Sequence, residues 1–271
     1  MIARLLMTRR RRGKTEPRLG RRGRIAMIRC CLAYAAIVIC SSVPPHSAAH
    51  AQPRAVIELF TSQGCSSCPP ADRLLGDLAA DPSLVPISVP VDYWDYLGWK
   101  DTLADPHNTA RQKAYAHARG DGQVYTPQVV VNGAMHAVGS DRAAIEAAIA
   151  SSRKNGAMSL LPTLTLSDAR LNVTVPDVTD ARTSAEVWLF GLVRTATIAI
   201  GRGENKGRTI TYHNVVRRWM KLGDWTGKAN SWSIPVQTLK GGNIDEAAVL
   251  LQSGTTEKPR AILGAALAAI Q

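Results

Sequence analysis

Residues 55–72 read AVIELFTSQGCSSCPPAD, and this stretch decides the fold. Its first six residues are almost entirely apolar, which predicts a short buried strand. A polar turn follows, and then two cysteines three positions apart, Cys65 and Cys68. The apolar residues after them recur at helical spacing, at positions 71, 74, 75 and 78. The stretch therefore predicts a strand, a turn that carries a Cys-x-x-Cys pair, and a helix.

The cysteine pair stands where strand changes to helix, a place that suits redox chemistry. Unpaired N–H groups and the positive end of the helix dipole favour an anionic sulfur. Sites of this kind lower a thiol pKa from about 8.5 to roughly 3.5–7.5. We therefore expect Cys65 at the helix start to be the attacking thiol and Cys68, one turn into the helix, the resolving thiol. Pro69 and Pro70 fit only a first helical turn, so the regular helix begins nearer Ser67 or its first turn is distorted.

The chain continues to about residue 155 as alternating helices and strands. The order strand–helix–strand–helix–strand–strand–helix predicts an α/β domain at residues 52–155, with helices packed on a mixed sheet. Asn132-Gly133 predicts the hairpin between the last two strands. The seven elements are expected at residues 55–60, 71–80, 84–91, 105–117, 125–131, 135–138 and 141–152.

From residue 156 onward the pattern changes to short β-like runs separated by turn signals. Such runs predict an antiparallel sandwich, which would form a smaller all-β domain at residues 156–271. The last run also fits a terminal helix at 261–270. The expected strands are at residues 160–166, 170–175, 185–193, 195–200, 210–219, 231–235, 247–252 and 261–268.

The N-terminus accounts for the basic character of the chain. The net charge is +12, but residues 1–51 hold eleven Lys and Arg and one Glu, which leaves 22 basic and 20 acidic side chains elsewhere. No basic patch remains to favour a nucleic-acid partner. The apolar run at 30–43 is shorter than the roughly 20 residues of a membrane span, and Ala49-His50-Ala51 follows it. Residues 1–51 are therefore predicted to be a cleaved export signal, with Met27 as an alternative start, and membrane anchoring is the less favoured interpretation.

Removal of this leader leaves Cys65 and Cys68 as the only two cysteines. An exported protein lies where disulfides persist. A disulfide that closes so short a loop would stabilise the fold little. A Cys65–Cys68 disulfide is therefore expected to be reactive and not structural. An inert disulfide and a metal pair, copper above all, are the alternatives, since thiolates suit Cu(I). Zinc would need two more ligands, and the histidines show no ligand-like spacing, so no metal and no cofactor is expected.

Thr126-Pro127, just before a predicted strand and hairpin, completes a pattern that resembles the thioredoxin superfamily. In that superfamily the proline is cis and lies against the cysteines, and the residue before it hydrogen-bonds an extended substrate. The resemblance thus implies a thioredoxin-like fold for residues 52–155 and a substrate-binding role for Thr126 and Pro127. Two features depart from the superfamily pattern. Gly64 replaces the usual aromatic residue, and Glu58 is the only carboxylate in the first strand, one residue early and on the opposite face.

Glu58 is therefore a candidate for proton transfer to Cys68. The alternative is a carboxylate that is partly exposed or paired at the sheet edge.

The segment at 92–103 is dense in aromatic residues, including Trp94 and Trp99. These residues either line the cysteine site and bind an apolar substrate surface, or they pack in the core of an inserted subdomain. Asp95 is the candidate polar neighbour of the thiols.

Three motifs are similar to a secreted family described as domain of unknown function, family 1223. They lie at residues 58–72, 91–99 and 125–128. The first is long and specific. This resemblance implies a thioredoxin-like fold and an exported protein, and it supplies no reaction.

The sequence thus predicts a periplasmic or secreted thiol–disulfide oxidoreductase. Its partners would be thiols or disulfides of other exported proteins, or a small thiol, without nucleic acid and without stable membrane insertion. Cys65 would form the mixed disulfide and Cys68 would resolve it. The alternative is a non-enzymatic binding or scaffold protein, in which the β domain recognises a partner and the disulfide is regulatory or vestigial. Copper handling is a weaker alternative.

Overall fold

The computed structural model describes residues 53–179, 183–239 and 241–270, which lie within one compact unit. The predicted export signal at residues 1–51 lies outside the described residues. Within the described ranges, no helix is long and apolar enough to cross a membrane.

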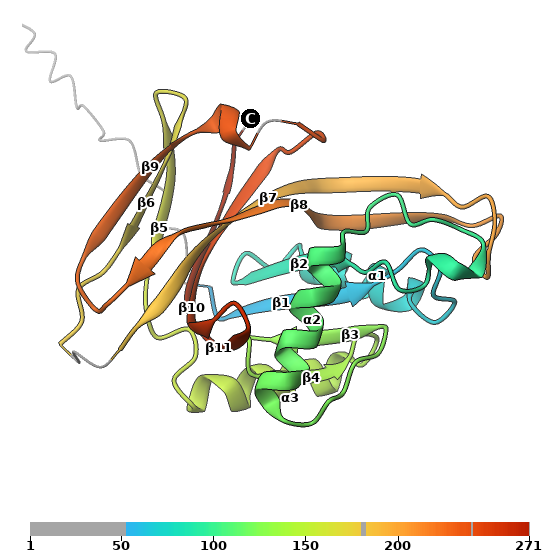
Figure 1. The fold of residues 1–271 in the computed structure, drawn as a ribbon, viewed down its shortest axis with the longest axis horizontal. Helices are drawn as coiled ribbons and strands as arrows, with labels where there is room; N and C mark the ends of the chain where they lie inside the picture. The colour runs from blue at the N-terminus through green and yellow to red at the C-terminus, as the bar shows by residue number, and fades with distance from the viewer. Residues whose placement is uncertain (1–52, 180–182, 240, 271) are drawn as a thin grey trace, which may run out of the picture. The chain divides into compact units, whose positions relative to one another are not determined.

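A mixed eight-stranded sheet forms the framework, in the order β11-β10-β7-β8-β2-β1-β3-β4 (Figure 1). β1 (Ala55–Thr61) runs parallel to β2 (Leu84–Pro90) on one side and antiparallel to β3 (Gln128–Val131) on the other. A hairpin joins β3 to the edge strand β4 (Met135–Val138). All seven residues of β1 are buried, as its apolar sequence predicts for a central strand.

Residues after position 155 supply the other half of this sheet. They contribute β7 (Ala185–Ala199), β8 (Thr209–Trp225), β10 (Glu246–Thr255) and β11 (Lys258–Ala269). β8 lies next to β2, with Ser88 opposite Val215, so the sheet runs without interruption across the expected domain boundary. The last run of the chain is a strand, not the alternative helix. Residues 222–224, which predict a turn, lie inside β8.

A second sheet of three strands covers part of the first. It contains β5 (Thr163–Ser167), β6 (Arg170–Val175) and β9 (Asn230–Pro235). Its buried side chains, such as Leu171 and Val173, belong to one apolar cluster with β7, β8 and β10. This part of the chain therefore packs as two layers, one of which is the large sheet that also contains β1.

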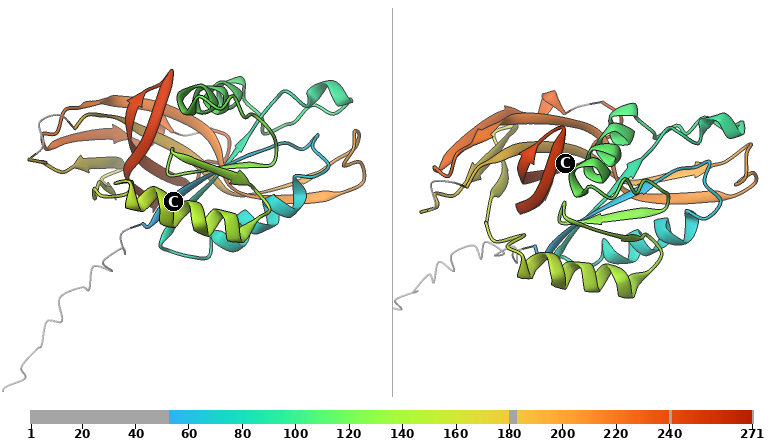
Figure 2. Two further views of the ribbon diagram at one scale, coloured as in Figure 1. Left: turned by 90° about the horizontal axis from the view of Figure 1, so that it is seen from below. Right: turned by 60° about the horizontal axis from the view of Figure 1, so that its bottom comes forward.

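The three helices cover the two faces of the β1 region. Side chains of α1 (Pro69–Leu78) and α3 (Arg142–Lys154) pack with Ile57 and Leu59 of β1. α2 (Pro106–Arg119) lies on the opposite face, where Tyr115 packs with Val56 and Phe60 (Figure 2). The alternation of side chains along a strand produces these two separate clusters.

A buried ion pair corrects the prediction for Glu58. Arg111 of α2 donates from Nε to Glu58 Oε1 at 2.6 Å and from NH2 to Oε2 at 3.2 Å. Tyr115 also donates to Glu58 Oε2, and Gln252 of β10 accepts from Arg111 at 3.0 Å. Burial opposes the charge of Arg111, but Glu58 and Tyr115 hold its pKa above the ordinary value. Because Glu58 is fixed on the α2 face, away from the α1 face, it is not placed to exchange a proton with Cys68.

Candidate redox site

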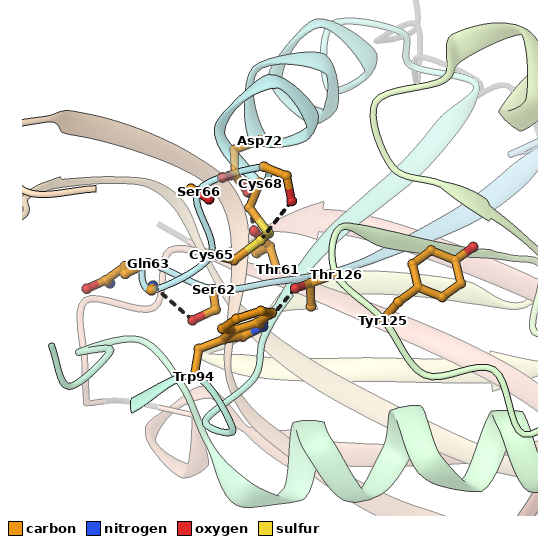
Figure 3. Close-up of a disulfide and its surroundings, with 12 residues drawn as sticks. Thr61, Ser62, Gln63, Cys65, Ser66, Cys68, Asp72, Trp94, Tyr125 and Thr126 are labelled. Atoms are coloured by element: carbon orange, nitrogen blue, oxygen red, sulfur yellow. Dashed lines mark hydrogen bonds between the residues drawn. A yellow bond between two sulfur atoms is a disulfide. The ribbon is translucent and has the colours of Figure 1, made fainter. Parts of the chain in front are cut away.

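Cys65 and Cys68 form a disulfide just beyond the C-terminal end of β1, with Cα atoms 5.4 Å apart (Figure 3). Both residues are buried, Cys65 with 1% of its surface exposed and Cys68 with none. Ser66 and Ser67 between them are exposed. A reagent would therefore approach the disulfide from the side of the two serines or by displacing the residues that cover Cys65.

The helix after the disulfide begins after Cys68 and not at Cys65. Cys68 is the N-cap of α1, and Pro69 and Pro70 occupy the first helical positions. Proline suits these positions because their N–H groups would be unpaired in any residue. Cys65 lies three residues before the N-cap, in a turn in which the Cys68 N–H donates to the Cys65 carbonyl at 3.2 Å. The expectation that Cys65 opens the helix is wrong, and the two prolines remove N–H groups that would have stabilised a thiolate.

The polar groups closest to Cys65 come from its own turn and from a distant hairpin. The Ser67 hydroxyl lies 3.4 Å from Cys65 Sγ. The Ser66 N–H donates to the carboxylate of Glu204 at 3.2 Å. A thiolate at Cys65 would therefore be stabilised by the Ser67 hydroxyl, while the next N–H along the chain is already bound to an acid.

The tip of the β7–β8 hairpin holds the cysteine turn in place. Asn205, at this tip, is fully buried, and its Nδ2 donates to the carbonyls of Gln63 and Cys65, both at 2.9 Å. These contacts join residues 140 or more positions apart. Gly201-Arg202-Gly203 predicts a turn here, but no feature of the sequence shows where that turn docks.

The Thr126–Pro127 peptide is cis, as the resemblance implied. The Gly139 N–H donates to the Pro127 carbonyl at 2.9 Å and ties this loop to the end of β4. The Thr126 hydroxyl accepts a hydrogen bond from Trp94 Nε1 at 2.8 Å, and Figure 3 shows both side chains beside the disulfide. Substrate binding by these residues stays a prediction.

Trp94 also explains why glycine precedes Cys65. A Cβ atom at Gly64 would lie 2.9 Å from Trp94 Cβ, closer than real Cβ contacts. Any larger side chain at position 64 would therefore displace Trp94. Tyr96, 77% exposed, stacks beyond Trp94 with the rings 6.5 Å apart.

Trp99 has a different role from Trp94. Its Nε1 donates to Gln63 Oε1 at 2.7 Å. On its other side, Cβ atoms placed at Gly201 and Gly203 would meet Trp99 at 3.1 and 3.2 Å. Trp99 thus packs between the cysteine turn and the hairpin tip, and substrate binding by Trp99 stays a prediction.

Two aspartates of this segment shape its loop. Asp95 Oδ1 accepts from the Asp101 N–H at 3.0 Å. Asp101 in turn accepts from the Gln63 N–H at 2.8 Å, and burial raises the pKa of its carboxyl. Asp95 therefore has a structural partner within its own segment, and its role as a polar neighbour of the thiols stays a prediction.

Asp72 is the acidic residue closest in sequence to the two cysteines, and we did not single it out from the sequence. It lies on α1 four positions after Cys68, and its Oδ1 accepts from the Thr61 hydroxyl at 2.8 Å. Burial raises the pKa of Asp72 to about 8, against the lowering effect of the Thr61 hydrogen bond. The available signal was its spacing from Cys68, which places both on one side of a helix.

We predict that Trp94→Phe accelerates reduction of the native disulfide by dithiothreitol. Phenylalanine keeps an aromatic cover but cannot donate to Thr126, so opening the cover costs less. Loss of a hydrogen bond of about 0.5–1.5 kcal/mol corresponds to a rate increase of roughly 2–10-fold. Trp188→Phe is the matched control, because it also removes an indole hydrogen bond, to Glu186, but leaves Thr126 untouched. Equal rates in Trp94→Phe and the native protein would show that this contact does not limit access.

Within residues 53–179, 183–239 and 241–270, no group of three or more His, Cys, Asp and Glu side chains is arranged to hold a metal ion.

A family model described as "Protein of unknown function (DUF1223)" matches residues 56–252. This range contains the cysteine turn, the Thr126–Pro127 loop and the β7–β8 hairpin. The chain belongs to this family. A comparison with curated proteins gives no match.

Two solved structures are similar to this DUF1223 member. The crystal structure of protein AGR_C_4864 from Agrobacterium tumefaciens is 31% identical, with a TM-score of 0.72 over 81% of this chain and 95% of that chain. The structure of HBP35 of Porphyromonas gingivalis is 11% identical, with a TM-score of 0.52 over 80% of this chain and 75% of that chain. At that identity, the likeness to HBP35 shows the fold alone.

Proposed function

We propose that the chain is an exported thiol–disulfide oxidoreductase with a thioredoxin-like fold and a Cys65–Cys68 couple. The observation that carries the proposal is a disulfide between cysteines three residues apart, at the end of a central strand and beside a cis Thr126–Pro127 peptide. The β2-β1-β3-β4 arrangement, with helices on both faces, supports the fold assignment.

The chemistry follows from the order of the two sulfurs. A partner thiolate attacks Cys65 Sγ, the Cys65–Cys68 bond breaks, and Cys68 leaves as a thiolate. A second partner thiolate then attacks the partner sulfur of the mixed disulfide and releases reduced Cys65. The partner is oxidised by two electrons to a disulfide, and the couple gains two electrons and two protons. The same steps in reverse reduce a partner disulfide.

The positions of the two cysteines support attack at Cys65. Cys68 is the N-cap of α1, whereas Cys65 lies in the turn before the helix, with the Ser67 hydroxyl 3.4 Å from its Sγ. Movement of Trp94 would free the Thr126 hydroxyl, which could then bind the backbone of an extended partner chain. The proposed partners are therefore protein thiols or disulfides outside the cytoplasm, or a small thiol, and the basic and apolar leader supports this location.

The proposal predicts turnover that depends on Cys65. Native protein is expected to catalyse thiol–disulfide exchange between glutathione and a disulfide-bonded model protein, measured by release of protein thiols. Cys65→Ser should lose all turnover. Cys68→Ser should lose multiple turnover but accumulate a mixed disulfide through Cys65, detected by mass. Turnover retained in Cys65→Ser would refute the proposal, as would native protein no faster than glutathione alone.

The burial of both sulfurs favours a second candidate function. In this case the chain is a binding or scaffold protein and its disulfide is regulatory or vestigial, locked by Asn205 and covered by Trp94. The two candidates differ in one observable. An oxidoreductase turns over partner thiols through this disulfide in the native fold, whereas in the scaffold protein a vestigial disulfide would be reduced only on unfolding and a regulatory one would be reduced without turnover.

A further inference from the structure

Two buried polar side chains, Asp72 and Tyr212, lie between the cysteine helix α1 and strand β8. Asp72 of α1 is buried, and among the described residues its Oδ2 has no hydrogen-bond partner. The hydroxyl of Tyr212 on β8 is likewise buried and has no partner in the described part of the chain. A buried carboxylate with a free oxygen is costly, so this arrangement favours the neutral, protonated acid.

The groups around the Asp72 carboxyl determine its charge. Burial is the largest influence and raises its pKa, the carboxylate of Asp101 raises it further, and the Thr61 hydroxyl and Arg73 lower it. Burial also raises the pKa of Tyr212, with a further contribution from Asp72 and Asp101. The resulting value for Asp72, about 8, lies close to the ordinary value of a thiol, about 8.5.

Asp72 is also placed on the side of Cys68. The Asp72 N–H donates to the Cys68 carbonyl at 3.1 Å, which is the first full helical turn of α1. Residues four apart project from the same side of a helix. On that side, Thr61 at the end of β1 binds the carboxyl, and Figure 3 shows Asp72, Thr61 and the disulfide together at the start of α1.

We propose that Asp72 is the group that gives a proton to Cys68 when the disulfide opens and takes it back when the disulfide closes. This inference rests on the proposed oxidoreductase function and assigns its proton-transfer residue. It replaces Glu58, which the Arg111 ion pair holds on the opposite face of β1.

The step balances without any further reactant. When a partner thiolate attacks Cys65, the departing Cys68 thiolate takes the proton of the Asp72 carboxyl, which leaves a Cys68 thiol and an Asp72 carboxylate. In the reverse direction, the Asp72 carboxylate removes the Cys68 proton. The Cys68 thiolate then attacks Cys65 Sγ of the mixed disulfide, and the partner leaves as a thiolate. A carboxyl held neutral by burial can give up this proton and take it back.

Asp72→Asn tests the proposal, because asparagine keeps the size and an oxygen for Thr61 but cannot transfer a proton. The rate of closure of the Cys65 mixed disulfide is measured by rapid mixing and acid quench from pH 6 to 10. We expect Asp72→Asn to slow closure by about 100-fold near pH 8, within the range of general acid–base catalysis. The variant should regain rate only as hydroxide deprotonates Cys68. Asp77→Asn, an exposed change on the same helix, is the control.

A measurement on the native protein avoids dependence on the variant. The infrared C=O stretching band of a protonated buried carboxyl should be present at pH 7 and absent in Asp72→Asn. The pH at which this band disappears should change when the disulfide is reduced. An unchanged pH, or an unchanged closure profile in Asp72→Asn while native protein turns over, would overturn the inference. Native protein without Cys65-dependent turnover would instead overturn the proposed function.

Discussion

Replacing Arg111 with alanine is expected to lower the free energy of unfolding by about 3–5 kcal/mol, because it leaves the Glu58 carboxylate buried without its counter-charge. Glu58 is fully buried and Arg111 nearly so. The guanidinium also lies 4.9 to 5.6 Å from the ring centres of Tyr115, Phe190 and Trp219. Chemical denaturation with fluorescence and circular dichroism measures this loss.

Arg54→Ala is the control for Arg111→Ala. Arg54 also binds a carboxylate, Glu146, through two nitrogens, but both side chains are partly exposed. A pair of this kind contributes about 0–1 kcal/mol. The loss of unfolding free energy in Arg111→Ala should therefore be severalfold larger than that in Arg54→Ala. Because the Arg111 network joins α2 to β7, β8 and β10, both halves of the chain should unfold in one transition. Comparable losses, or separate transitions for the two halves, would contradict this description of the fold.

Asp72→Asn is expected to be more stable than the native protein at high pH and about equally stable near pH 4. The pKa of Asp72 is about 8 in the folded chain, against 3.8 for an unperturbed aspartate. Between these values the folded state keeps a proton that the unfolded state has lost, so native stability falls as pH rises. At about 1.4 kcal/mol per pH unit, the accumulated loss by pH 8 is on the order of 5 kcal/mol.

Urea denaturation of native and variant proteins at pH 4, 6, 8 and 9 gives this difference directly. It should grow through the range and become constant above pH 8. Asp77→Asn, at an exposed position of the same helix, controls for the removal of an acid from α1. A constant difference between Asp72→Asn and native protein from pH 4 to 9 would show that Asp72 is ionised throughout.

The local sequence predicted most elements of the first 155 residues, because their signals are local. The apolar run of β1, the starts of α2 and α3 near residues 105 and 141, and the Asn132-Gly133 hairpin all appear where expected. Each depends on residues within a few positions of one another. Pro69 and Pro70 were also informative. They indicated that a regular helix does not begin at Cys65, and α1 does begin after Cys68.

The long-range arrangement was beyond such reasoning. No local signal links Glu58 to Arg111, 53 positions away, so the acid of β1 was considered a proton-transfer group. Likewise, nothing near Asn205 shows that the β7–β8 hairpin reaches the cysteine turn or that β8 extends the first sheet. These contacts depend on how separate segments pack, and they made the C-terminal half part of the site.

The most direct test of the central claim is the equilibrium of the Cys65–Cys68 couple in the folded protein. Native protein is equilibrated in glutathione and dithiothreitol buffers of defined potential, thiols are trapped by alkylation, and mass spectrometry counts the labels. We predict a single two-electron transition, with zero or two labels per chain, at a potential above about −300 mV, the limit below which structural disulfides lie. A couple that is reduced only below about −300 mV, or only after unfolding, would contradict a redox function and favour the scaffold protein.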